Sequence, residues 1–315
     1  MRAEPSYVAL HRRGELGQRI RLALGMLAEC SLCPLNCGVN RLEDARGVCR
    51  TGRRAVVSSA GSHFGEEAPL VGRGGSGTMF IGWCNLRCRF CQNYSISQMG
   101  EGRETTPEQM ASMILHLQDQ GCHNINFVSP THVVPQILEA LPLAIEGGLR
   151  LPLVYNTGGY DSVEALHLLE GIFDIYMPDM KYADDRVGRR LSGVKDYPVV
   201  NRAAVKEMHR QVGDLVVDEE GVAVRGLLVR QLVLPNDLAG TEGALAFLAE
   251  EISRDTYLNL MDQYRPYYRI TDDPQLGRPL SKHEYERALR LAVSCGMRRL
   301  DRPRALQRWQ MWRDE

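Results

Sequence analysis

Residues 78–97 read TMFIGWCNLRCRFCQNYSIS, an apolar run followed at once by three cysteines in the spacing C-x3-C-x2-C. The apolar run, residues 78–83, is typical of a buried β-strand. Cys84, Cys88 and Cys91 would therefore lie in a loop at the carboxyl end of that strand. Enzymes built on α/β barrels keep their active sites at this end of the strands, so the loop is a candidate site.

Short apolar runs and amphipathic stretches of helical period alternate along the chain. The runs predict strands over residues 78–83, 124–129, 151–156, 172–178, 226–235 and 256–261. Helices are predicted over residues 107–120, 133–146, 161–170, 200–212, 241–253 and 282–295. Such a series favours an α/β fold with a parallel sheet, which right-handed crossovers would curl into a partial (βα)6 TIM-like barrel. A doubly wound sheet is the alternative.

The composition is that of a globular protein: 315 residues, 44% hydrophobic and 24% charged, with a formal net charge of -1. This balance gives no electrostatic reason to expect nucleic acid or a membrane surface as a partner, and we expect neither. Residues 1–29 carry charges throughout and contain no apolar run of signal-peptide or membrane-span length. We therefore expect a cytoplasmic protein.

The domain organisation follows from the same patterns. No glycine-rich linker or internal repeat interrupts residues 76–300, so they are predicted to form one core domain. Residues 1–75 would be a small Cys-rich N-terminal extension. Residues 301–315 form a basic tail with two tryptophans, typical of a charged surface segment, a frayed end or a docking segment for a partner.

Seven of the nine cysteines fall into two groups, which in a reducing compartment indicate metal or redox chemistry rather than disulfides. Three thiolates on the loop after the first strand can bind three irons of a 4Fe-4S cubane and leave the fourth iron open. An open metal site suits catalysis, whereas the alternative is a structural zinc completed by a distant side chain. Cys122 and Cys295 stand alone and are predicted to be packing residues.

The segment CNLRCRFC resembles the C-x3-C-x-aromatic-C signature of the radical S-adenosylmethionine (SAM) superfamily. The resemblance implies that SAM chelates the open iron through its amino and carboxylate groups. It further implies that an electron from the reduced cluster cleaves SAM to methionine and a 5'-deoxyadenosyl radical, which abstracts hydrogen from a substrate. An electron donor such as flavodoxin or ferredoxin would then be a partner.

The same resemblance assigns SAM contacts to the ends of the predicted strands. Phe90 would lie near the adenine, and the turn of Asn156 and Gly158 would approach the nucleoside. Asp179 would orient Lys181 toward the SAM carboxylate by a charge-assisted hydrogen bond, and Arg230 is the candidate second cation.

The segment SPTH stands where relatives usually carry a glycine-rich segment that binds the SAM amino group. Here Ser129, Pro130 and Thr131 would take that role, because a hydroxyl and backbone carbonyls can accept hydrogen bonds from an ammonium group.

Within the superfamily, residues 30–295 are similar to the branch that resembles the pyruvate formate-lyase activating enzyme. The shared segments are CPLNCGVNR, CQNYSIS, SPTH and MPDMKY. This similarity implies an iron-dependent oxidoreductase that activates or modifies a protein or peptide. Two alternatives remain: radical modification of a small metabolite, and a non-catalytic zinc-binding interaction module.

A second cysteine group, CSLCPLNCGVNRLEDARGVC, supplies Cys30, Cys33, Cys37 and Cys49 in the spacing C-x2-C-x3-C-x11-C. The segment is rich in turn-forming residues and would fold poorly without something to fold around. Four thiolates can close a tetrahedral zinc site or bind an auxiliary 4Fe-4S cluster. Both a structural metal and an electron relay remain open.

Other polar residues give weaker signals. Exposed surface is the ordinary explanation for Glu66 and Glu67, and a core hydrogen bond is the ordinary explanation for His63. His63 and His132 are nevertheless candidates for substrate contacts. No catalytic residue can be named from the sequence.

Overall fold

One sheet runs through residues 4–301, the part of the chain that the computed structural model describes. The strands lie in the order β10-β9-β8-β6-β5-β4-β2-β1-β3, and β7 pairs with β8 off this path. Their bounds are β1 (Ala55–His63), β2 (Ser76–Ile81), β3 (Arg103–Thr105), β4 (Ile125–Val128), β5 (Leu153–Thr157), β6 (Ile175–Met180), β7 (Val216–Val217), β8 (Ala223–Leu232), β9 (Tyr257–Met261) and β10 (Arg299–Leu300).

The wall of the sheet consists of β2, β4, β5, β6, β8 and β9, each parallel to the next in chain order. A doubly wound sheet reverses its strand order at a switch point. These six strands show no reversal, so the doubly wound alternative is wrong. The α/β fold with a mostly parallel sheet is confirmed, and the strand order is that of a partial (βα)6 barrel.

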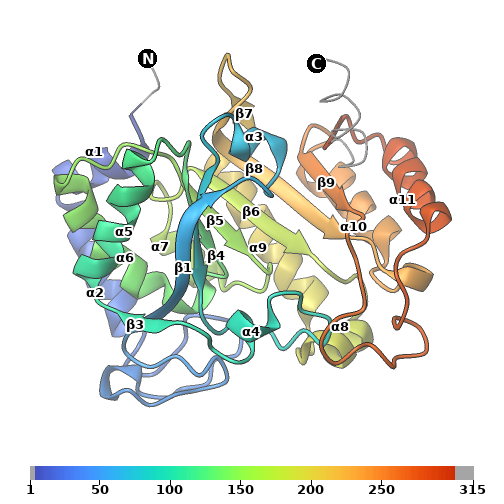
Figure 1. The fold of residues 1–315 in the computed structure, drawn as a ribbon, viewed down its shortest axis with the longest axis horizontal. Helices are drawn as coiled ribbons and strands as arrows, with labels where there is room; N and C mark the ends of the chain where they lie inside the picture. Colours follow the sequence, from blue (N-terminus) through green and yellow to red (C-terminus); the bar gives the residue numbers. More distant parts are fainter. Residues whose placement is uncertain (1–3, 302–315) are drawn as a thin grey trace.

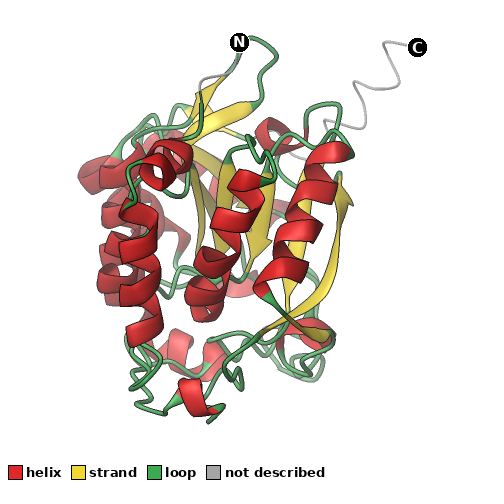
Figure 2. Ribbon diagram, turned by 90° about the vertical axis from the view of Figure 1, so that its left-hand side faces the viewer, coloured by secondary structure: helices red, strands yellow, loops and turns green. Residues whose placement is uncertain are grey.

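The helices are α1 (Ser6–Arg12), α2 (Glu15–Gly25), α3 (Ala68–Val71), α4 (Tyr94–Ser97), α5 (Pro107–Asp119), α6 (Val134–Glu146), α7 (Val163–Leu168), α8 (Asp185–Ser192), α9 (Tyr197–Val212), α10 (Thr241–Phe247) and α11 (Lys282–Ser294). Most of them cover the outer face of the curved sheet, whereas α3 lies at one end of the barrel and α4 and α8 lie at the other (Figures 1 and 2). Short 3-10 turns cover Arg41–Glu43, Thr131–Val133 and Pro235–Asp237, and a π-helical turn, Leu248–Ile252, extends α10.

Each of the six predicted strands is present, and the main difference lies at β6. The strand continues to Met180, so Asp179 belongs to the sheet and does not follow it. Pairing explains the extension, since Asp179 and Met180 align with Arg230 and Gln231 of β8. Every residue of β5 and β6 is buried, as expected for parallel strands covered on both faces.

Capping interactions define the starts of two helices that flank the barrel. The Thr106 side chain accepts from the backbone N–H of Gln109, and the Gln109 side chain accepts from the Thr106 N–H. Ser281 and Glu284 form the same reciprocal pair at the start of α11. Each capping box satisfies two backbone donors that the first helical turn would otherwise leave unpaired.

The N-terminal region is more closely joined to the barrel than its predicted role as an appendage implies. Strand β1 pairs antiparallel with β2, and β3 pairs antiparallel with β1. Helices α1 and α2 pack on α6 and α7. A loop-rich segment, residues 26–54, joins α2 to β1 and carries the second cysteine group. We call it the four-cysteine lobe.

No helix within residues 4–301 has both the length and the apolar composition that a membrane crossing requires. The predicted basic tail, residues 301–315, lies outside the described residues except for Asp301, which accepts a hydrogen bond from Tyr257 Oη at 2.6 Å.

Candidate functional site

A cavity of about 230 Å3 opens at the carboxyl ends of the parallel strands. Its walls include the loop after β2 and residues at the ends of β4, β5, β6, β8 and β9. Of the predicted site residues, the cavity is lined by Cys84, Cys88, Phe90, Cys91, Ser129, Asn156, Gly158, Asp179, Lys181 and Arg230. The barrel therefore brings together side chains that are far apart in the sequence.

Each thiol of the cavity has a hydrogen-bond partner. The backbone N–H of Leu86 donates to Cys84 Sγ at 3.4 Å. Cys88 Sγ lies 3.0 Å from Ser192 Oγ, and Cys91 Sγ lies 3.0 Å from Ser97 Oγ. Donors of this kind stabilise a thiolate, which is the form that binds iron.

Burial, together with the neighbouring thiols of Cys88 and Cys91, raises the pKa of Cys84 to about 12. Burial also raises the pKa of Cys88, although the Lys181 ammonium opposes that change. The three thiols are thus so close that the ionisation of one disfavours the ionisation of the others. A cationic metal centre among them would reverse this preference, because metal binding displaces the thiol protons.

The arrangement fits a polynuclear cluster better than a single ion. Within residues 4–301, no three His, Cys, Asp or Glu side chains are arranged to hold one metal ion. In a 4Fe-4S cluster each thiolate binds its own iron, so the sulfurs need not converge on one point. The described cysteine loop therefore suits the predicted cluster, with donors already placed at each sulfur.

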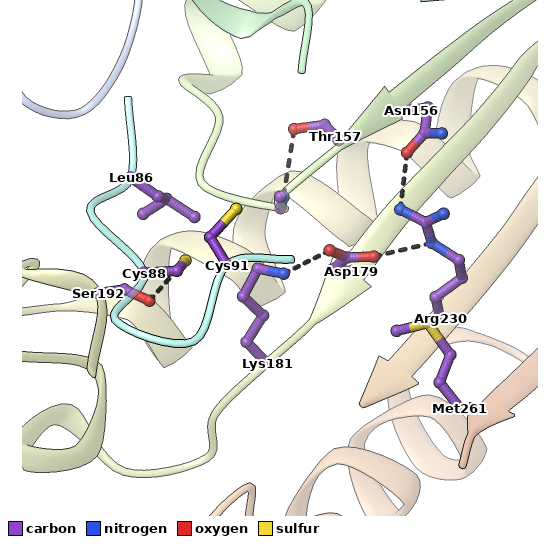
Figure 3. Close-up of polar contacts among 12 residues, drawn as sticks. Leu86, Cys88, Cys91, Asn156, Thr157, Asp179, Lys181, Ser192, Arg230 and Met261 are labelled. Carbon is purple, nitrogen blue, oxygen red and sulfur yellow. Dashed lines mark hydrogen bonds and ion pairs between the residues drawn. The ribbon is translucent and has the colours of Figure 1, made fainter. Parts of the chain in front are cut away.

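A single buried carboxylate, Asp179, lies between two cations (Figure 3). Lys181 Nζ donates to its Oδ2 at 2.5 Å, and Arg230 Nε donates to its Oδ1 at 2.8 Å. Arg230 Nη2 also donates to Asn156 Oδ1 at 2.7 Å. We call this set of four side chains the charge ladder.

The three titratable side chains of the charge ladder are all charged. Burial favours the neutral form of Asp179, but the charges of Arg230 and Lys181 hold its pKa below the usual range. Burial alone would lower the pKa of Lys181 and Arg230, yet the Asp179 carboxylate raises both. Two cations thus share the Asp179 carboxylate at the cavity wall. Arg230 also lies near Glu66, whereas Asp179 is the one carboxylate that Lys181 pairs with among residues 4–301, so positive charge at Lys181 is available for an anionic group of a ligand.

Lys181 is better placed than Arg230 to meet such a group. The Arg230 guanidinium already donates to Asp179 and Asn156, and its Nη1 lies 3.8 Å from Glu66 Oε2. Lys181 Nζ donates to Asp179, and an ammonium group carries two further protons that can be donated.

One residue of the SPTH segment lines the cavity, and the others lie behind its wall. Ser129 lines the cavity and adopts φ 60°, a left-handed conformation that is uncommon for a residue with a side chain. Pro130 and Thr131 do not line the cavity. The hydroxyl of Thr131 instead donates to buried Asp161 Oδ1 at 2.7 Å, and Asp161 also accepts from Tyr155 and Thr157.

Helix α9 contributes two positioning residues that the sequence did not reveal. Tyr197 Oη donates to the carbonyls of Gly158 and Asp179, and it accepts from the Lys181 N–H. Asn201 Nδ2 donates to the carbonyls of Gly159 and Asp179. Their effect is to tie the end of β5 to the end of β6. No local motif marks them, because they lie within an ordinary amphipathic helix.

Close approach explains the second glycine of the YNTGGY turn. Gly159 has φ +74°, and an added Cβ would lie 2.1 Å from the Asp179 carbonyl oxygen. Only glycine fits this position without displacing the backbone of the charge ladder.

Strand β9, the last of the six wall strands, supplies cavity residues that the sequence analysis also did not identify. Met261, Gln263 and Tyr264 line the cavity at the end of β9. Tyr264 contacts Phe90 edge to face at 5.9 Å, which fixes the predicted adenine-side ring. The position of these residues after a predicted strand was the signal that could have identified them.

The remaining candidates lie away from the cavity lining. His132 is buried, its Nε2 lies 3.0 Å from the Gly82 carbonyl, and burial lowers its pKa to about 3. His63 packs edge to face on Phe80 at 5.9 Å. Glu66 and Glu67 directly precede α3 and are not exposed as expected: Glu66 Oε2 lies 3.8 Å from Arg230 Nη1, and buried Glu67 accepts from Asn259 Nδ2 through its Oε1. Neither histidine is placed to contact a ligand in this cavity.

The profile of the Radical SAM superfamily matches residues 78–218, which include the cysteine loop and the charge-ladder residues up to Lys181. The uncharacterised protein MJ0674 of Methanocaldococcus jannaschii is 35% identical over 287 residues, covering 88% of this chain and 78% of that protein. The chain belongs to the radical SAM superfamily. Members of this superfamily are enzymes that use a 4Fe-4S cluster and SAM.

This radical SAM protein is also similar to a second relative by sequence and to solved structures. A second uncharacterised M. jannaschii protein, MJ0808, is 24% identical over 295 residues, covering 85% of this chain and 79% of that protein. Among solved structures, native anSMEcpe with bound AdoMet and Cp18Cys peptide has a TM-score of 0.48 and 11% identity. That similarity covers 70% of this chain and 60% of anSMEcpe, so the chain spans less than two thirds of that structure.

Proposed function

We propose that this chain is a radical SAM enzyme that removes a hydrogen atom from a protein or peptide substrate. When bound, the cluster and SAM would supply a 5'-deoxyadenosyl radical, which abstracts hydrogen. One observation carries the proposal: the cysteine loop and the charge ladder line the same cavity.

The cysteine loop would hold the cluster through Cys84, Cys88 and Cys91. Donors from Leu86, Ser192 and Ser97 would stabilise the negative charge of the three thiolates and fix their orientation. These donors come from the loop itself, from α4 and from α8, so the packing of two helices would support the geometry of the site.

The charge ladder would bind the SAM carboxylate. Lys181 would donate to that carboxylate, while Asp179 holds the Lys181 side chain in place and offsets the charge of Arg230. Arg230 in turn occupies Asn156 Oδ1, which orients the Asn156 amide so that its N–H donors are available to the cofactor.

An apolar wall would exclude water from the reacting groups. Leu86, Phe90, Leu232, Met261 and Tyr264 line the cavity beside the thiols. A dry wall protects a reactive intermediate from side reactions and strengthens the electrostatic contacts of the charge ladder.

The size of the cavity supports a substrate that enters only in part. At about 230 Å3 the cavity lies below the roughly 300 to 1,000 Å3 typical of small-molecule sites, so bound SAM would fill it and leave no room for a second complete small molecule. One residue of a protein or peptide could reach the cofactor from the open side while the rest of the chain stays outside. The resemblance to activating enzymes supports the same substrate class and a flavodoxin or ferredoxin as electron donor.

Deuterium transfer tests both the reaction and the substrate class. An extract from cells grown in deuterated medium would be divided into macromolecular and small-molecule fractions and incubated anaerobically with the reduced, cluster-loaded protein and SAM. We expect deuterium in 5'-deoxyadenosine with the macromolecular fraction, measured by mass spectrometry. Deuterium transfer from the small-molecule fraction alone would contradict a protein substrate, and no SAM cleavage at all would leave the zinc-module alternative.

Replacing Lys181 by methionine should weaken SAM binding about ten- to a hundredfold, the value of a charge-assisted hydrogen bond of roughly 1.5 to 3 kcal/mol. The substitution removes the ammonium group and retains most of the apolar stem. Calorimetry on oxidised, cluster-loaded protein would measure binding without SAM cleavage, and iron analysis should show unchanged cluster content.

Lys206 provides the matched control, because it forms an exposed pair with Glu251 and does not line the cavity. Lys206→Met should bind SAM like the unmodified protein. If Lys181→Met lowered only the melting temperature and bound SAM normally, Lys181 would be a structural partner of Asp179 and not a SAM ligand.

A further inference from the structure

The four-cysteine lobe brings its thiols together. Cys30, Cys33 and Cys49 are buried, and Cys37 is half-buried. The Cys30 N–H donates to the Val39 carbonyl at 3.0 Å and the Gly38 N–H donates to the Cys30 carbonyl at 3.1 Å, so the chain at Cys30 runs beside the chain at Cys37. An added Cβ on Gly47 would lie 2.5 Å from Cys37 Sγ, so the chain passes close to this group of sulfurs.

Arg41, in the middle of the lobe, is fully buried. Its Nε and Nη2 donate to the Gly52 carbonyl, each at 3.1 Å, and its Nη1 donates to the His132 carbonyl at 2.8 Å. The remaining contact is with a thiol, since Nη1 lies 3.8 Å from Cys30 Sγ. Its charge is thus placed among neutral groups.

The ion pairs of residues 4–301 include none to Arg41. Asp44, three residues along the chain, is exposed and pairs with Arg46 at 3.1 Å, and the Arg41 charge is the smallest of the causes that lower the pKa of Asp44. By contrast, Arg230 has the Asp179 carboxylate, and Arg53, at the end of the lobe, has Glu139 at 2.6 Å. A buried charge without an opposite charge is strongly unfavourable, so Arg41 requires an anion.

We propose that Cys30, Cys33, Cys37 and Cys49 bind an iron-sulfur cluster as thiolates and that Arg41 is the buried counter-cation of this centre. Within residues 4–301 no three His, Cys, Asp or Glu side chains converge on one metal ion, so a cluster, in which each thiolate binds its own iron, fits the lobe better than zinc. Four thiolates around the dicationic core of a 4Fe-4S cluster carry a net negative charge and would supply the anion that Arg41 lacks among its contacts. This inference is independent of the proposed reaction.

The position of the lobe joins the proposed centre to the SAM site. Arg41 donates to the His132 carbonyl, and the His132 ring contacts the carbonyl of Gly82, two residues before Cys84. Arg87, between Cys84 and Cys88, donates to the carbonyl of Val48, the neighbour of Cys49. The metal centre would therefore hold the lobe against the cysteine loop of the cavity.

Metal analysis tests the centre itself. In a variant with Cys84, Cys88 and Cys91 all replaced by serine, only the lobe retains a cysteine group. After anaerobic reconstitution, with iron plus sulfide or zinc offered in separate samples, we expect one iron-sulfur cluster per chain, detected as iron with matching sulfide and a cluster absorbance. Colourless binding of zinc alone, or binding of neither metal, would overturn the proposal.

Arg41 is tested by its effect on metal retention. Arg41→Gln in the same background should lower metal affinity about ten- to a hundredfold in competition with a chelator, because a charge-assisted contact is lost. Arg41→Lys keeps the charge and should lose much less. Arg53→Gln is the matched control, since Arg53 has its own carboxylate, and it should leave metal affinity unchanged.

Stability without metal distinguishes a counter-cation from a merely structural arginine. Without the metal centre Arg41 is an uncompensated buried charge, so Arg41→Gln should cost less melting temperature in metal-free than in metal-loaded protein. Equal losses in both forms, or a metal affinity equal to that of Arg53→Gln, would contradict the counter-cation role. If Arg41→Gln fails to fold, Arg41→Lys still tests the charge by its metal affinity.

Discussion

Replacing Cys84, Cys88 or Cys91 singly by alanine should abolish SAM cleavage. A cubane held by only two thiolates loses both its ligation and its redox properties. The measurement is 5'-deoxyadenosine formation by anaerobically reconstituted protein with dithionite as reductant. Iron content should fall but not vanish if the four-cysteine lobe also binds iron, so the two assays separate the two centres.

Cys295 supplies the control for this experiment. It is half-buried near the end of α11 and does not line the cavity, so Cys295→Ala should cleave SAM at the normal rate. Cleavage retained by any of the three loop variants would rule out the cluster assignment, because all three thiolates are needed to hold three irons.

Replacing Asp179 by asparagine should lower the free energy of unfolding by about 3 to 5 kcal/mol, the usual cost of removing one partner from a buried charge pair. Two cations donate to this one carboxylate, and the uncharged amide would leave Lys181 without an opposite charge and Arg230 with only the more distant Glu66 at 3.8 Å. Denaturant unfolding of the metal-free protein under anaerobic conditions would measure the loss. Asp255→Asn is the control, because its exposed pair with Arg298 should contribute at most about 1 kcal/mol.

The pH dependence of stability offers a second measurement. The pKa of Asp179 is lowered on folding, so its stabilisation is present above the unfolded pKa, near 3.9, and is lost as the pH falls through the lower folded value. Asp179→Asn should lack this acid-dependent component. If Asp179→Asn unfolded at the same denaturant concentration as the unmodified protein and with the same acid dependence, the charge ladder would not stabilise the fold.

The barrel wall was predictable because parallel strands buried on both faces are short, continuous apolar runs. Strand β1 was not predicted, since its sequence AVVSSAGSH is rich in small polar residues and the second half of the strand is largely exposed. It forms because β2 offers an unpaired edge and β3 covers the other side. Tertiary pairing of this kind has no local signature.

The site likewise contains residues that could be predicted from the sequence and residues that could not. The cysteine loop and the Asp179 and Lys181 pair are local patterns and could be identified from spacing. The contact between Asp179 and Arg230 depends on the register of β6 against β8, which no local pattern specifies. Arg41 was least accessible to prediction, because a charged residue in a turn-rich segment is ordinarily exposed, whereas the fold encloses it.

The packing of α1 and α2 also bears on the order in which the protein matures. Tyr7 Oη donates to the Leu151 carbonyl at 2.7 Å, and Arg19 Nη1 donates to the carbonyls of His167 and Leu168. Helices α1 and α2 thus lack their partners on the barrel until the chain has been synthesised through α6 and α7. The four-cysteine lobe, which follows α2 and rests on His132, would remain open to metal delivery during that interval and close only when the barrel is assembled.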